Sequence, residues 1–312
     1  DFDRLQEYMP ELKRTGVKIK SIPFLPLIDS SDVDPALWER IATTIQDNYE
    51  EYDGFVVLHG TDTMAYTASA LSFMLENLSK PVIFTGSQLP IGDLRTDAKE
   101  NLITAIQIAS LQQDGKPVIS EVCLYFEYKL HRGNRTTKIN AENFNAFVSP
   151  NYPHLIESGV NLKTFPELFL PNARTMELRI HKNLENNVAI IKMFPGINES
   201  VLEAIFEIPQ LKGIVLETYG AGNAPTEEWF LKLLKNGIAR GLEIVNVTQC
   251  SIGSVTMGKY ETSSSLKEIG VISGKDITTE AAITKLMYLL GQNVSPKIFK
   301  TIFETPLRGE IS

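Results

Sequence analysis

The sequence predicts an α/β protein of two domains, each a mostly parallel sheet with helices on both faces, Rossmann-like or flavodoxin-like. Short apolar runs alternate along the whole chain with segments whose apolar residues have helical spacing. At 312 residues, the chain is longer than one hydrophobic core usually serves. The alternation is interrupted by polar, charged residues, so we expect an N-terminal domain at 1–172, a linker at 173–187 and a C-terminal domain at 188–312.

The first domain opens with a strand-like segment, Val17–Leu25. A helix follows, with Asp34 as its N-cap and Pro35 at its first position, and it runs to about Tyr52. The next expected elements are a strand at Gly54–Leu58, a helix at Met64–Leu78, a strand at Pro81–Phe84, a helix at Arg95–Leu111 and a strand at Val122–Phe126. Between residues 128 and 165 the pattern degrades, and we assign no element there.

The second domain repeats the alternation of strands and helices. Its expected strands are Val188–Met193, Gly213–Leu216 and Glu243–Val247, and its expected helices are Glu199–Glu207, Thr226–Arg240, Thr278–Gly291 and Pro296–Phe303. Strands that alternate with helices in this way form βαβ units, and their parallel sheets are covered on both faces.

Composition excludes several classes of partner. The net charge is −8 and no long Lys/Arg cluster occurs, which argues against nucleic acid or an anionic membrane, because both need a basic footprint. No apolar run approaches the length of a membrane span. The two cysteines and four histidines have no metal-ligand or disulfide-framework spacing, so we expect a reducing, cytoplasmic location.

Polar residues follow the predicted strands at their carboxyl ends, where open parallel sheets bind ligands. These turns read PLIDSSDVDP, HGTDT, TGSQLP, ETYGAGNAP and TQCSIGS. They are rich in hydroxyls, amides and glycine, and they carry few long charged side chains. A small polar ligand fits them better than a polyphosphate, and neither GxxxxGK[ST] nor GxGxxG occurs.

The residues alone leave two interpretations of the HGTDT turn about equal. Thr61 or Asp62 caps the following helix, or the turn carries chemistry. Similarly, Ser30 and Ser31 fit an ordinary turn, and His59 fits a packed histidine better than a catalytic one. A distant lysine, Lys138 in RGNRTTKIN, is a candidate base. Lysines act as bases only where burial or nearby cations lower their pKa, and otherwise they are solvated surface charges.

Taken together, these segments resemble the cytoplasmic (type I) bacterial L-asparaginases over nearly the whole chain. The stretch HGTDTMAYTASALSFMLENL is highly specific. The other matching stretches are DSSD (29–32), TGSQLP (85–90), RGNRTTK (132–138), VSPN (148–151), YGAGNAP (219–225), VNVTQC (245–250) and LRGE (307–310).

The resemblance implies roles for individual residues. Thr61 is expected to be a catalytic hydroxyl, Lys138 its proton acceptor, and Asp62 a partner that also holds the ammonium of the substrate. Since asparagine is a zwitterion, its site also needs an anion-binding group. The residues expected to bind substrate are Ser30 and Ser31 (α-carboxylate), Thr61, Asp62 (ammonium) and the backbone of Ser87 (side-chain amide).

The implied activity is hydrolysis of L-asparagine to L-aspartate and ammonia through a threonyl ester, without metal or cofactor. A glutaminase-leaning amidohydrolase is the nearest alternative, and a tRNA-dependent amidotransferase domain is disfavoured by the lack of a basic surface. A non-catalytic amino-acid-binding or sensing module is an alternative of a different class. A cysteine hydrolase built on Cys250 has little support.

One family motif is absent from the sequence. The family's other essential threonine lies in TGGTIG at the end of a first, central strand, and a mobile loop with a tyrosine follows it; this sequence begins after both, at Asp1. A sheet that lost its central strand should be unstable, so we expect the natural protein to contain this segment.

The resemblance also implies a homo-oligomer, a dimer or a dimer of dimers, in which the second domain of one subunit closes the site of another. Candidates for that contact are Asn223, Tyr260 and Glu261. Some members carry an allosteric asparagine site between subunits, at positions that match Thr137, Glu217, Asn223 and Cys250. A frequent residue at the position of Glu217 is arginine, and this reversed charge argues against activation by the same contacts.

Overall fold

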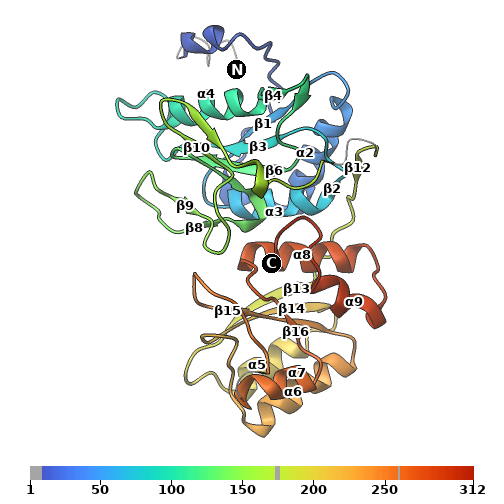
Figure 1. Cartoon of the computed structure of the whole chain (residues 1–312). Coiled ribbons are helices and arrows are strands. Elements are labelled where there is room, and N and C mark those ends of the chain that lie inside the picture. Colours follow the sequence, from blue (N-terminus) through green and yellow to red (C-terminus); the bar gives the residue numbers. More distant parts are fainter. Residues whose placement is uncertain (1–8, 173–175, 259–260) are drawn as a thin grey trace. The chain divides into compact units, whose positions relative to one another are not determined.

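The computed structural model describes residues 9–172, 176–258 and 261–312, without the side chains of 261–263. The chain divides into two compact units, Asp1–Lys182 and Asn183–Ser312, and each is an α/β unit with its own sheet (Figure 1). The predicted fold class is therefore confirmed. The two units are described separately below.

A six-stranded sheet forms the centre of the first unit, in the order β1-β3-β6-β7-β10-β11. Its strands are β1 (Phe55–Leu58), β3 (Val82–Thr85), β6 (Val122–Phe126), β7 (Lys129–Arg132), β10 (Ile156–Ser158) and β11 (Leu162–Thr164). The first three are parallel, and the others run antiparallel to their neighbours. The carboxyl ends of β1 and β3 therefore meet at one edge of the sheet.

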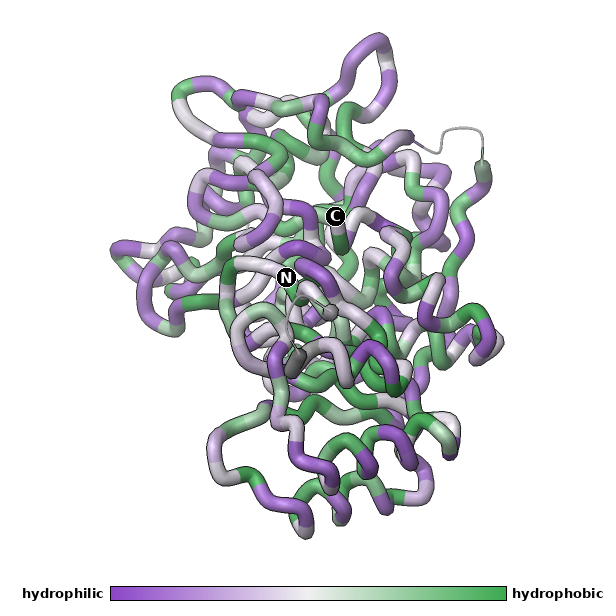
Figure 2. Tube along the Cα trace, turned by 60° about the horizontal axis from the view of Figure 1, so that its bottom comes forward, coloured by the Kyte–Doolittle hydropathy of each residue, from purple (hydrophilic) through white to green (hydrophobic). Residues whose placement is uncertain are grey.

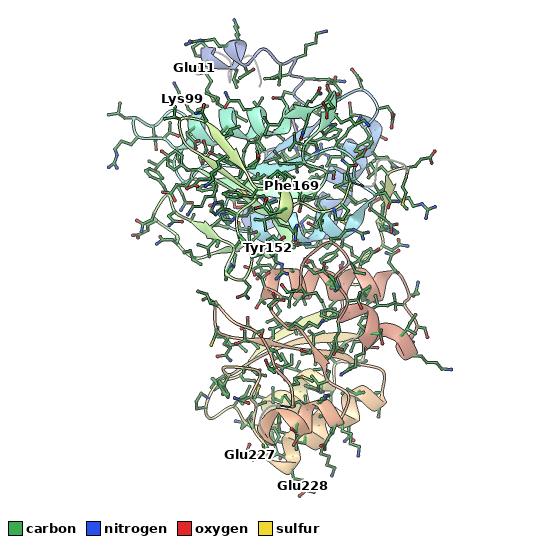
Figure 3. All side chains as sticks on the ribbon, viewed as in Figure 1. Glu11, Lys99, Tyr152, Phe169, Glu227 and Glu228 are labelled. Atoms are coloured by element: carbon green, nitrogen blue, oxygen red, sulfur yellow. The ribbon has the colours of Figure 1, made fainter. Side chains whose placement is uncertain are left out.

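Helices cover both faces of this sheet (Figure 1). On one face, Ala105 and Ile108 of α4 (Ala98–Ala109) pack against Ile83, Cys123 and Tyr125 of the strands. Against the outer side of α4 lies the short helix η1 (Pro10–Thr15); Figure 3 labels Glu11 and Lys99 there. The other face is covered by α3 (Met64–Met74), which is buried on almost every side and whose sequence, MAYTASALSFM, contains no charged residue. Next to it lies α2 (Pro35–Asp47), which begins as expected, because the Asp34 side chain accepts from Leu37 N at 2.9 Å.

The predicted strand at Val17–Leu25 is wrong. No strand is assigned in this segment, and it pairs with no strand of the described chain. Val17 and Ile19 pack against the cluster around Leu12, but the rest is largely exposed, with 44% of Ile22 and 66% of Leu25 accessible. Pro23 also has no N–H to donate to a ladder. A strand needs a neighbour to accept its hydrogen bonds, and β1 is the edge of the sheet in the described chain.

Several other boundaries differ from the prediction. Helix α2 ends at Asp47 and not near Tyr52. Helix α3 ends at Met74 and not at Leu78, and Leu75–Glu76 forms β2 after it. Strand β2 pairs with β12 (Arg179–Ile180), which lies in the predicted linker. The region without a predicted pattern, 128–165, contains β7, β10, β11 and a separate hairpin of β8 (Thr137–Lys138) and β9 (Phe147–Val148). These strands have two to four residues, too few for a period of two to be recognised.

The second unit has a four-stranded, all-parallel sheet in the order β13-β14-β15-β16. Its elements are β13 (Val188–Lys192), α5 (Glu199–Phe206), β14 (Gly213–Thr218), α6 (Glu228–Ala239), β15 (Glu243–Thr248), α7 (Glu261–Glu268), β16 (Ile272–Ser273), α8 (Thr279–Gly291) and α9 (Pro296–Phe303). One face carries α8 and α9, and the other carries α5, α6 and α7 (Figure 1). The sequence had predicted neither α7 nor β16.

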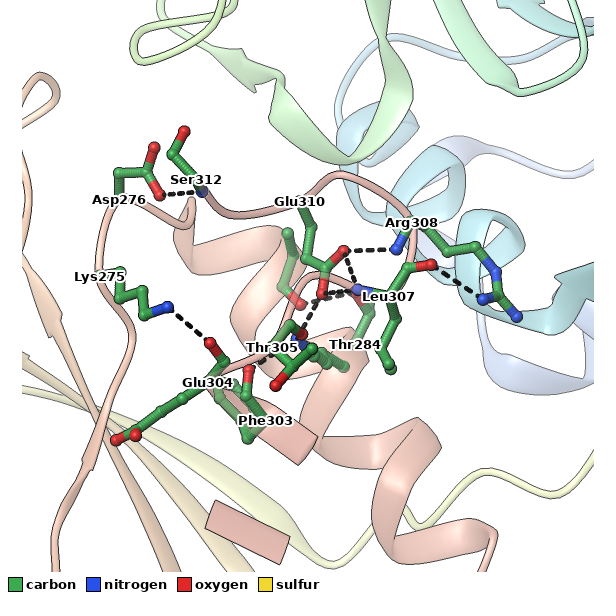
Figure 4. Close-up of polar contacts among 12 residues, drawn as sticks. Lys275, Asp276, Thr284, Phe303, Glu304, Thr305, Leu307, Arg308, Glu310 and Ser312 are labelled. Atoms are coloured by element: carbon green, nitrogen blue, oxygen red, sulfur yellow. Dashed lines mark hydrogen bonds and ion pairs between the residues drawn. The ribbon is translucent and has the colours of Figure 1, made fainter. Parts of the chain in front are cut away.

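The chain end folds onto α8 through a buried ion pair. Glu310 binds Lys285, and both side chains are completely buried. The carboxylate of Glu310 also accepts from the backbone N–H groups of Leu307 and Arg308 (Figure 4). A short terminal segment is thereby fixed by polar contacts in the interior of the unit.

The hydropathy of the residues varies along the chain. Hydrophobic and hydrophilic stretches alternate, and hydrophilic residues (purple) dominate many loops at the margin of the view (Figure 2). In the described part of the chain, no helix combines the length and the apolar character needed to cross a membrane.

Candidate active site

The turn HGTDT joins β1 to α3, and the side chains of its two threonines and its aspartate bind other segments. Thr63 occupies the N-cap position of α3 but makes no side-chain capping hydrogen bond. Its hydroxyl donates to the carbonyl of Ser30 at 2.6 Å. The side chains of Thr61 and Asp62 also form hydrogen bonds with distant residues. The capping interpretation of this turn is therefore wrong, and its side chains are available for other roles.

Thr61 and Asp62 share one partner, Lys138. The lysine Nζ donates to Thr61 Oγ1 at 2.8 Å and to Asp62 Oδ1 at 2.7 Å. The side chain of Lys138 is 17% exposed, whereas that of Asp62 is 64% exposed. The hydroxyl of Thr61 in turn donates to Gln88 Oε1 at 3.0 Å. An amine that contacts both a hydroxyl and a carboxylate can activate an oxygen nucleophile.

Lys138 reaches this turn because the chain before it packs tightly on α3. It ends β8, which follows the short helix η3 (Gly133–Arg135). A Cβ added at Gly133 would lie 3.1 Å from both Ala68 Cβ of α3 and the carbonyl of Val122. A larger residue at this position would push η3, and β8 with it, away from α3.

Ser30 and Ser31 lie in the short helix η2 (Ser30–Asp32), beside the HGTDT turn. A Cβ added at Gly60 would lie 2.6 Å from Ser30 Oγ, so only glycine allows the two turns to approach this closely. Ser31 donates to Asp29 Oδ1 from its backbone N–H (2.9 Å) and from its hydroxyl (2.7 Å). These hydrogen bonds lower the pKa of Asp29. The Asp29 carboxylate therefore fixes the shape of η2 and accepts the proton of the Ser31 hydroxyl in a hydrogen bond.

Ser87 lies in the turn after β3, next to the end of β1. A Cβ added at the preceding Gly86 would lie 2.3 Å from the carbonyl of His59, so the two turns touch backbone to backbone. Residues from the turns after β1 and β3 are thus brought together with η2 and β8 in the first unit. All six residues predicted to be catalytic or to bind substrate lie on these four segments: Ser30, Ser31, Thr61, Asp62, Ser87 and Lys138.

His59 supports the turn as a neutral, partly buried ring. Its Nδ1 bonds to the carbonyl of Gly60 at 2.7 Å, and its Nε2 bonds to the hydroxyl of Thr67 at 3.0 Å. That hydroxyl accepts from Trp38 Nε1 at 3.0 Å, so its own proton is directed to His59. Burial lowers the pKa of His59, in keeping with this neutral form.

Three residues of the site were not singled out from the sequence: Thr63, Gln88 and Asp97. Gln88 belongs to the strand-end turn TGSQLP, so its amide next to Ser87 was a signal that could have been used. Asp97 accepts from the backbone N–H groups of Gln88 and Leu89, and this role depends on tertiary structure alone.

The residues predicted for an inter-subunit or allosteric site fall in both units. Thr137 lies on β8 of the first unit, while Glu217, Asn223 and Cys250 lie at or just after the carboxyl ends of β14 and β15 in the second. The carboxylate of Glu217 accepts from the hydroxyl of Thr279 at 2.7 Å and lies 3.6 Å from Lys192 Nζ. Tyr260 lies outside the described residues, as does the side chain of Glu261. Glu217 is thus already paired with a cation of its own chain.

The described side chains include no group of three or more His, Cys, Asp or Glu placed to hold a metal ion. The polar contacts of the site in the first unit are made by hydroxyl, amide, amine and carboxylate groups.

Comparisons with known proteins cover both units. The family described as "Asparaginase, N-terminal" matches residues 1–168, and the "Glutaminase/Asparaginase C-terminal domain" matches residues 187–303. L-asparaginase 1 of Escherichia coli (strain K12) is 45% identical over 305 residues, which cover 97% of this chain and 88% of that protein.

A second curated relative has a different name. The 60 kDa lysophospholipase of Mus musculus is 45% identical over 288 residues, which cover 92% of this chain and 50% of that protein. Among solved structures, that of L-asparaginase I from Vibrio cholerae O1 biovar eltor str. N16961 has a TM-score of 0.90 and 44% identity. The match covers 100% of this chain and 92% of that one.

Proposed function

Because this chain belongs to the asparaginase family, as its motifs predicted, we propose that it hydrolyses L-asparagine to L-aspartate and ammonia through a threonyl ester. The observation that carries the proposal is the contact of Lys138 Nζ with both Thr61 Oγ1 and Asp62 Oδ1. It brings an amine, a hydroxyl and a carboxylate together at the carboxyl edge of the sheet, where such folds bind small ligands.

Both half-reactions need an attacking O–H group to lose its proton. In the first, a threonine oxygen bonds to the side-chain carbonyl carbon, the C–N bond breaks, and the nitrogen leaves as ammonia with the transferred proton. In the second, water adds to the ester and releases L-aspartate and the threonine hydroxyl. The contact of Lys138 Nζ with Thr61 Oγ1 supports a role for these two residues in moving this proton, the lysine as base and then as acid.

The same turns supply groups that match the charges of the substrate. The carboxylate of Asp62 is 64% exposed and is available to the ammonium of asparagine. Ser30 lies in η2 beside the HGTDT turn, where its hydroxyl suits the α-carboxylate. Ser31 donates to Asp29 from its N–H and its hydroxyl in this structure, so its proposed contact with the α-carboxylate requires the exchange of Asp29 for the substrate. The backbone of Ser87, at the neighbouring turn, is the proposed contact for the side-chain amide.

The test is a substrate comparison with the protein expressed from its full natural gene. Ammonia release is measured with L-asparagine and with L-glutamine, and fatty-acid release is measured with a lysophosphatidylcholine. Asparagine is expected to give the highest kcat/KM. Binding of asparagine by calorimetry without ammonia release would replace this proposal with an amino-acid-binding module. A higher kcat/KM with glutamine or with the lysophospholipid would show that L-asparagine is not the preferred substrate.

We also propose that the protein is a cytoplasmic homo-oligomer, a dimer or a dimer of dimers, in which Asn223 and the pair Tyr260 and Glu261 contribute to the site of a neighbouring subunit. The family resemblance supports this proposal. Light scattering of the purified protein would measure the assembly, and a monomer with full activity would overturn it.

A further inference from the structure

The side chain of Gln88 connects the catalytic hydroxyl to another part of the site. Its Oε1 accepts from Thr61 Oγ1 at 3.0 Å, and its Nε2 donates to the carbonyl of Asn143 at 3.1 Å. The two partners lie 27 and 55 residues away in the sequence. A glutamine side chain has high rotamer entropy, so it is ordered only where both ends of its amide are bound.

The backbone of Gln88 is held as firmly as its side chain. Its N–H donates to both carboxylate oxygens of Asp97, at 3.1 and 3.0 Å, and Leu89 N donates to Oδ1 at 3.1 Å. Asn101 Nδ2 binds both Asp97 Oδ2 (3.2 Å) and the carbonyl of Gly86 (2.9 Å). The turn that carries Gln88 is therefore anchored to the start of α4 before any ligand binds.

These contacts determine the direction in which the Thr61 hydroxyl points its single proton. The hydroxyl donates to Gln88 Oε1 and accepts from Lys138 Nζ at 2.8 Å. An amide oxygen is a fixed acceptor that does not take the proton away at ordinary pH. Gln88 therefore selects one rotamer of Thr61 and keeps its oxygen within reach of the lysine, while Lys138 remains the group that exchanges the proton.

The other end of the amide binds the loop that follows Lys138. This loop, residues 139–146, joins β8 to β9, and Ile139 N donates to the carbonyl of Ala146 at 2.8 Å. Inside it, Asn140 Oδ1 accepts from the N–H groups of Glu142 and Asn143, each at 2.9 Å. One glutamine amide thus joins Thr61 to the hairpin that carries its proton acceptor.

We propose that Gln88 is a positioning residue for the reaction, which fixes Thr61 Oγ1 and the Lys138 hairpin in one geometry through the two ends of its amide. The inference rests on the proposed function. It predicts that loss of the amide lowers kcat and leaves KM almost unchanged, because in this geometry Gln88 acts on the catalytic groups and not on the substrate.

Two variants separate the effects of the amide. Gln88→Met keeps the length of the side chain and removes both hydrogen bonds; kcat should fall about 10- to 100-fold, the range expected for a misplaced catalytic group. Gln88→Glu keeps an acceptor for Thr61 but adds a negative charge near Lys138, because both residues contact the Thr61 hydroxyl. That charge stabilises the protonated lysine, so the acidic limb of the kcat/KM profile should move to higher pH. Gln107→Met, an exposed glutamine on α4, is the matched control and should leave both constants unchanged.

The outcomes are distinct. A rise in KM that exceeds the fall in kcat for Gln88→Met would make Gln88 a substrate contact and overturn the proposal. An unchanged pH profile in Gln88→Glu would also count against it. If the wild-type protein releases no ammonia, the proposed function fails. The positioning role of Gln88 is then tested by crystal structures of the wild type and of Gln88→Met. The Gln88→Met structure should show Thr61 in a different or mixed rotamer and a displaced 139–146 loop, and if both are unchanged the inference falls.

Discussion

Lys138 Nζ lies 2.8 Å from the hydroxyl oxygen of Thr61, although 77 residues separate them in the sequence. The contact depends on two short segments with little freedom, the turn between β1 and α3 and the hairpin of β8 and β9. Because Lys138 also binds Asp62, a single amine orders the side chains of both Thr61 and Asp62.

The first prediction concerns this contact. Lys138→Met should lower kcat for ammonia release at least about 100-fold, because it removes the group that exchanges the proton. Thr61→Val should have a similar effect, because it keeps the shape of the side chain and removes the hydroxyl. Steady-state kinetics with L-asparagine measure both, and circular dichroism checks the fold.

Matched controls for these variants lie far from the turn. Lys116→Met changes an exposed lysine on β5 (Lys116–Pro117), and Thr44→Val changes a hydroxyl that donates to the carbonyl of Arg40 in α2. Both should retain wild-type kinetics. Near-normal turnover by Lys138→Met or Thr61→Val would remove the residue concerned from the mechanism.

The second prediction separates binding from turnover at Asp62. Asp62→Asn keeps the size of the side chain and removes the charge that is proposed to hold the substrate ammonium. A charge-assisted hydrogen bond contributes about 1.5–3 kcal/mol, so KM should rise about 10- to 100-fold. The fall in kcat should be smaller, because Lys138 still contacts Thr61. An unchanged KM would show that Asp62 only orients the lysine; Asp114→Asn, in the turn between β4 (Gln112–Gln113) and β5, is the control.

The sequence was sufficient to predict the parallel strands and the helices between them, because their apolar patterns are long enough to have a period. Val122–Phe126 and Pro296–Phe303 were predicted with the boundaries that the structure has. The strand at Val17–Leu25 failed because its alternating pattern describes a strand only when a neighbour is present to pair with it. The short strands β8 and β9 have two residues each, and pairing alone defines them.

The candidate site was predicted only in part from its residues. HGTDT and TGSQLP stood out as polar turns after strands and Lys138 as a candidate base, and the family resemblance then joined Thr61, Asp62 and Lys138 in one site. Gln88 was missed because its importance comes from two partners that are distant in the sequence. Helix capping was a reasonable expectation for Thr61 and Asp62, and it failed because α3 begins later, with Thr63 at its N-cap position, while the side chains of Thr61 and Asp62 bind Lys138.

The third prediction concerns pH and stability in the first unit. His131 is 5% exposed, lines a cavity of about 250 Å³, and its Nδ1 has no hydrogen-bond partner among the described residues. Burial, with smaller effects of His154 and Lys129, lowers its pKa to about 3. Other residues of the cavity wall include Tyr152, labelled in Figure 3. The folded protein therefore keeps the ring neutral at a pH where the unfolded chain binds a proton.

The sign of this effect follows from proton linkage. As the pH falls from about 6.5 to about 3, the unfolded state gains a proton that the folded state does not, so the free energy of unfolding decreases. The contribution is at most about 1.4 kcal/mol per pH unit. His131→Gln should flatten this acidic slope in urea titrations. Glu243→Gln is a control of opposite sign, because burial raises the pKa of Glu243 to about 7 and its contribution to stability is lost as the pH rises. An unchanged acidic slope in His131→Gln would contradict the assignment.

The fourth prediction concerns the buried ion pair of the second unit. Lys285 Nζ donates to Glu310 and to the carbonyls of Phe303 and Thr305, at 2.7 and 2.8 Å for the carbonyls. Figure 4 labels these three partners. Lys285→Met should lower the free energy of unfolding by about 3–5 kcal/mol, because it leaves a buried carboxylate without its cation. Lys192→Met, which removes an exposed partner of Glu217, should cost at most about 1 kcal/mol.

A double variant tests the cause of this loss. In Lys285→Met/Glu310→Gln the unpaired charge is gone, and the amide oxygen of Gln still accepts from the N–H groups of Leu307 and Arg308. The double variant should therefore be more stable than Lys285→Met alone, although the carbonyls of Phe303 and Thr305 remain unpaired in both. If instead the double variant is less stable than the single one, packing around Lys285 and not the buried charge controls the stability of the chain end.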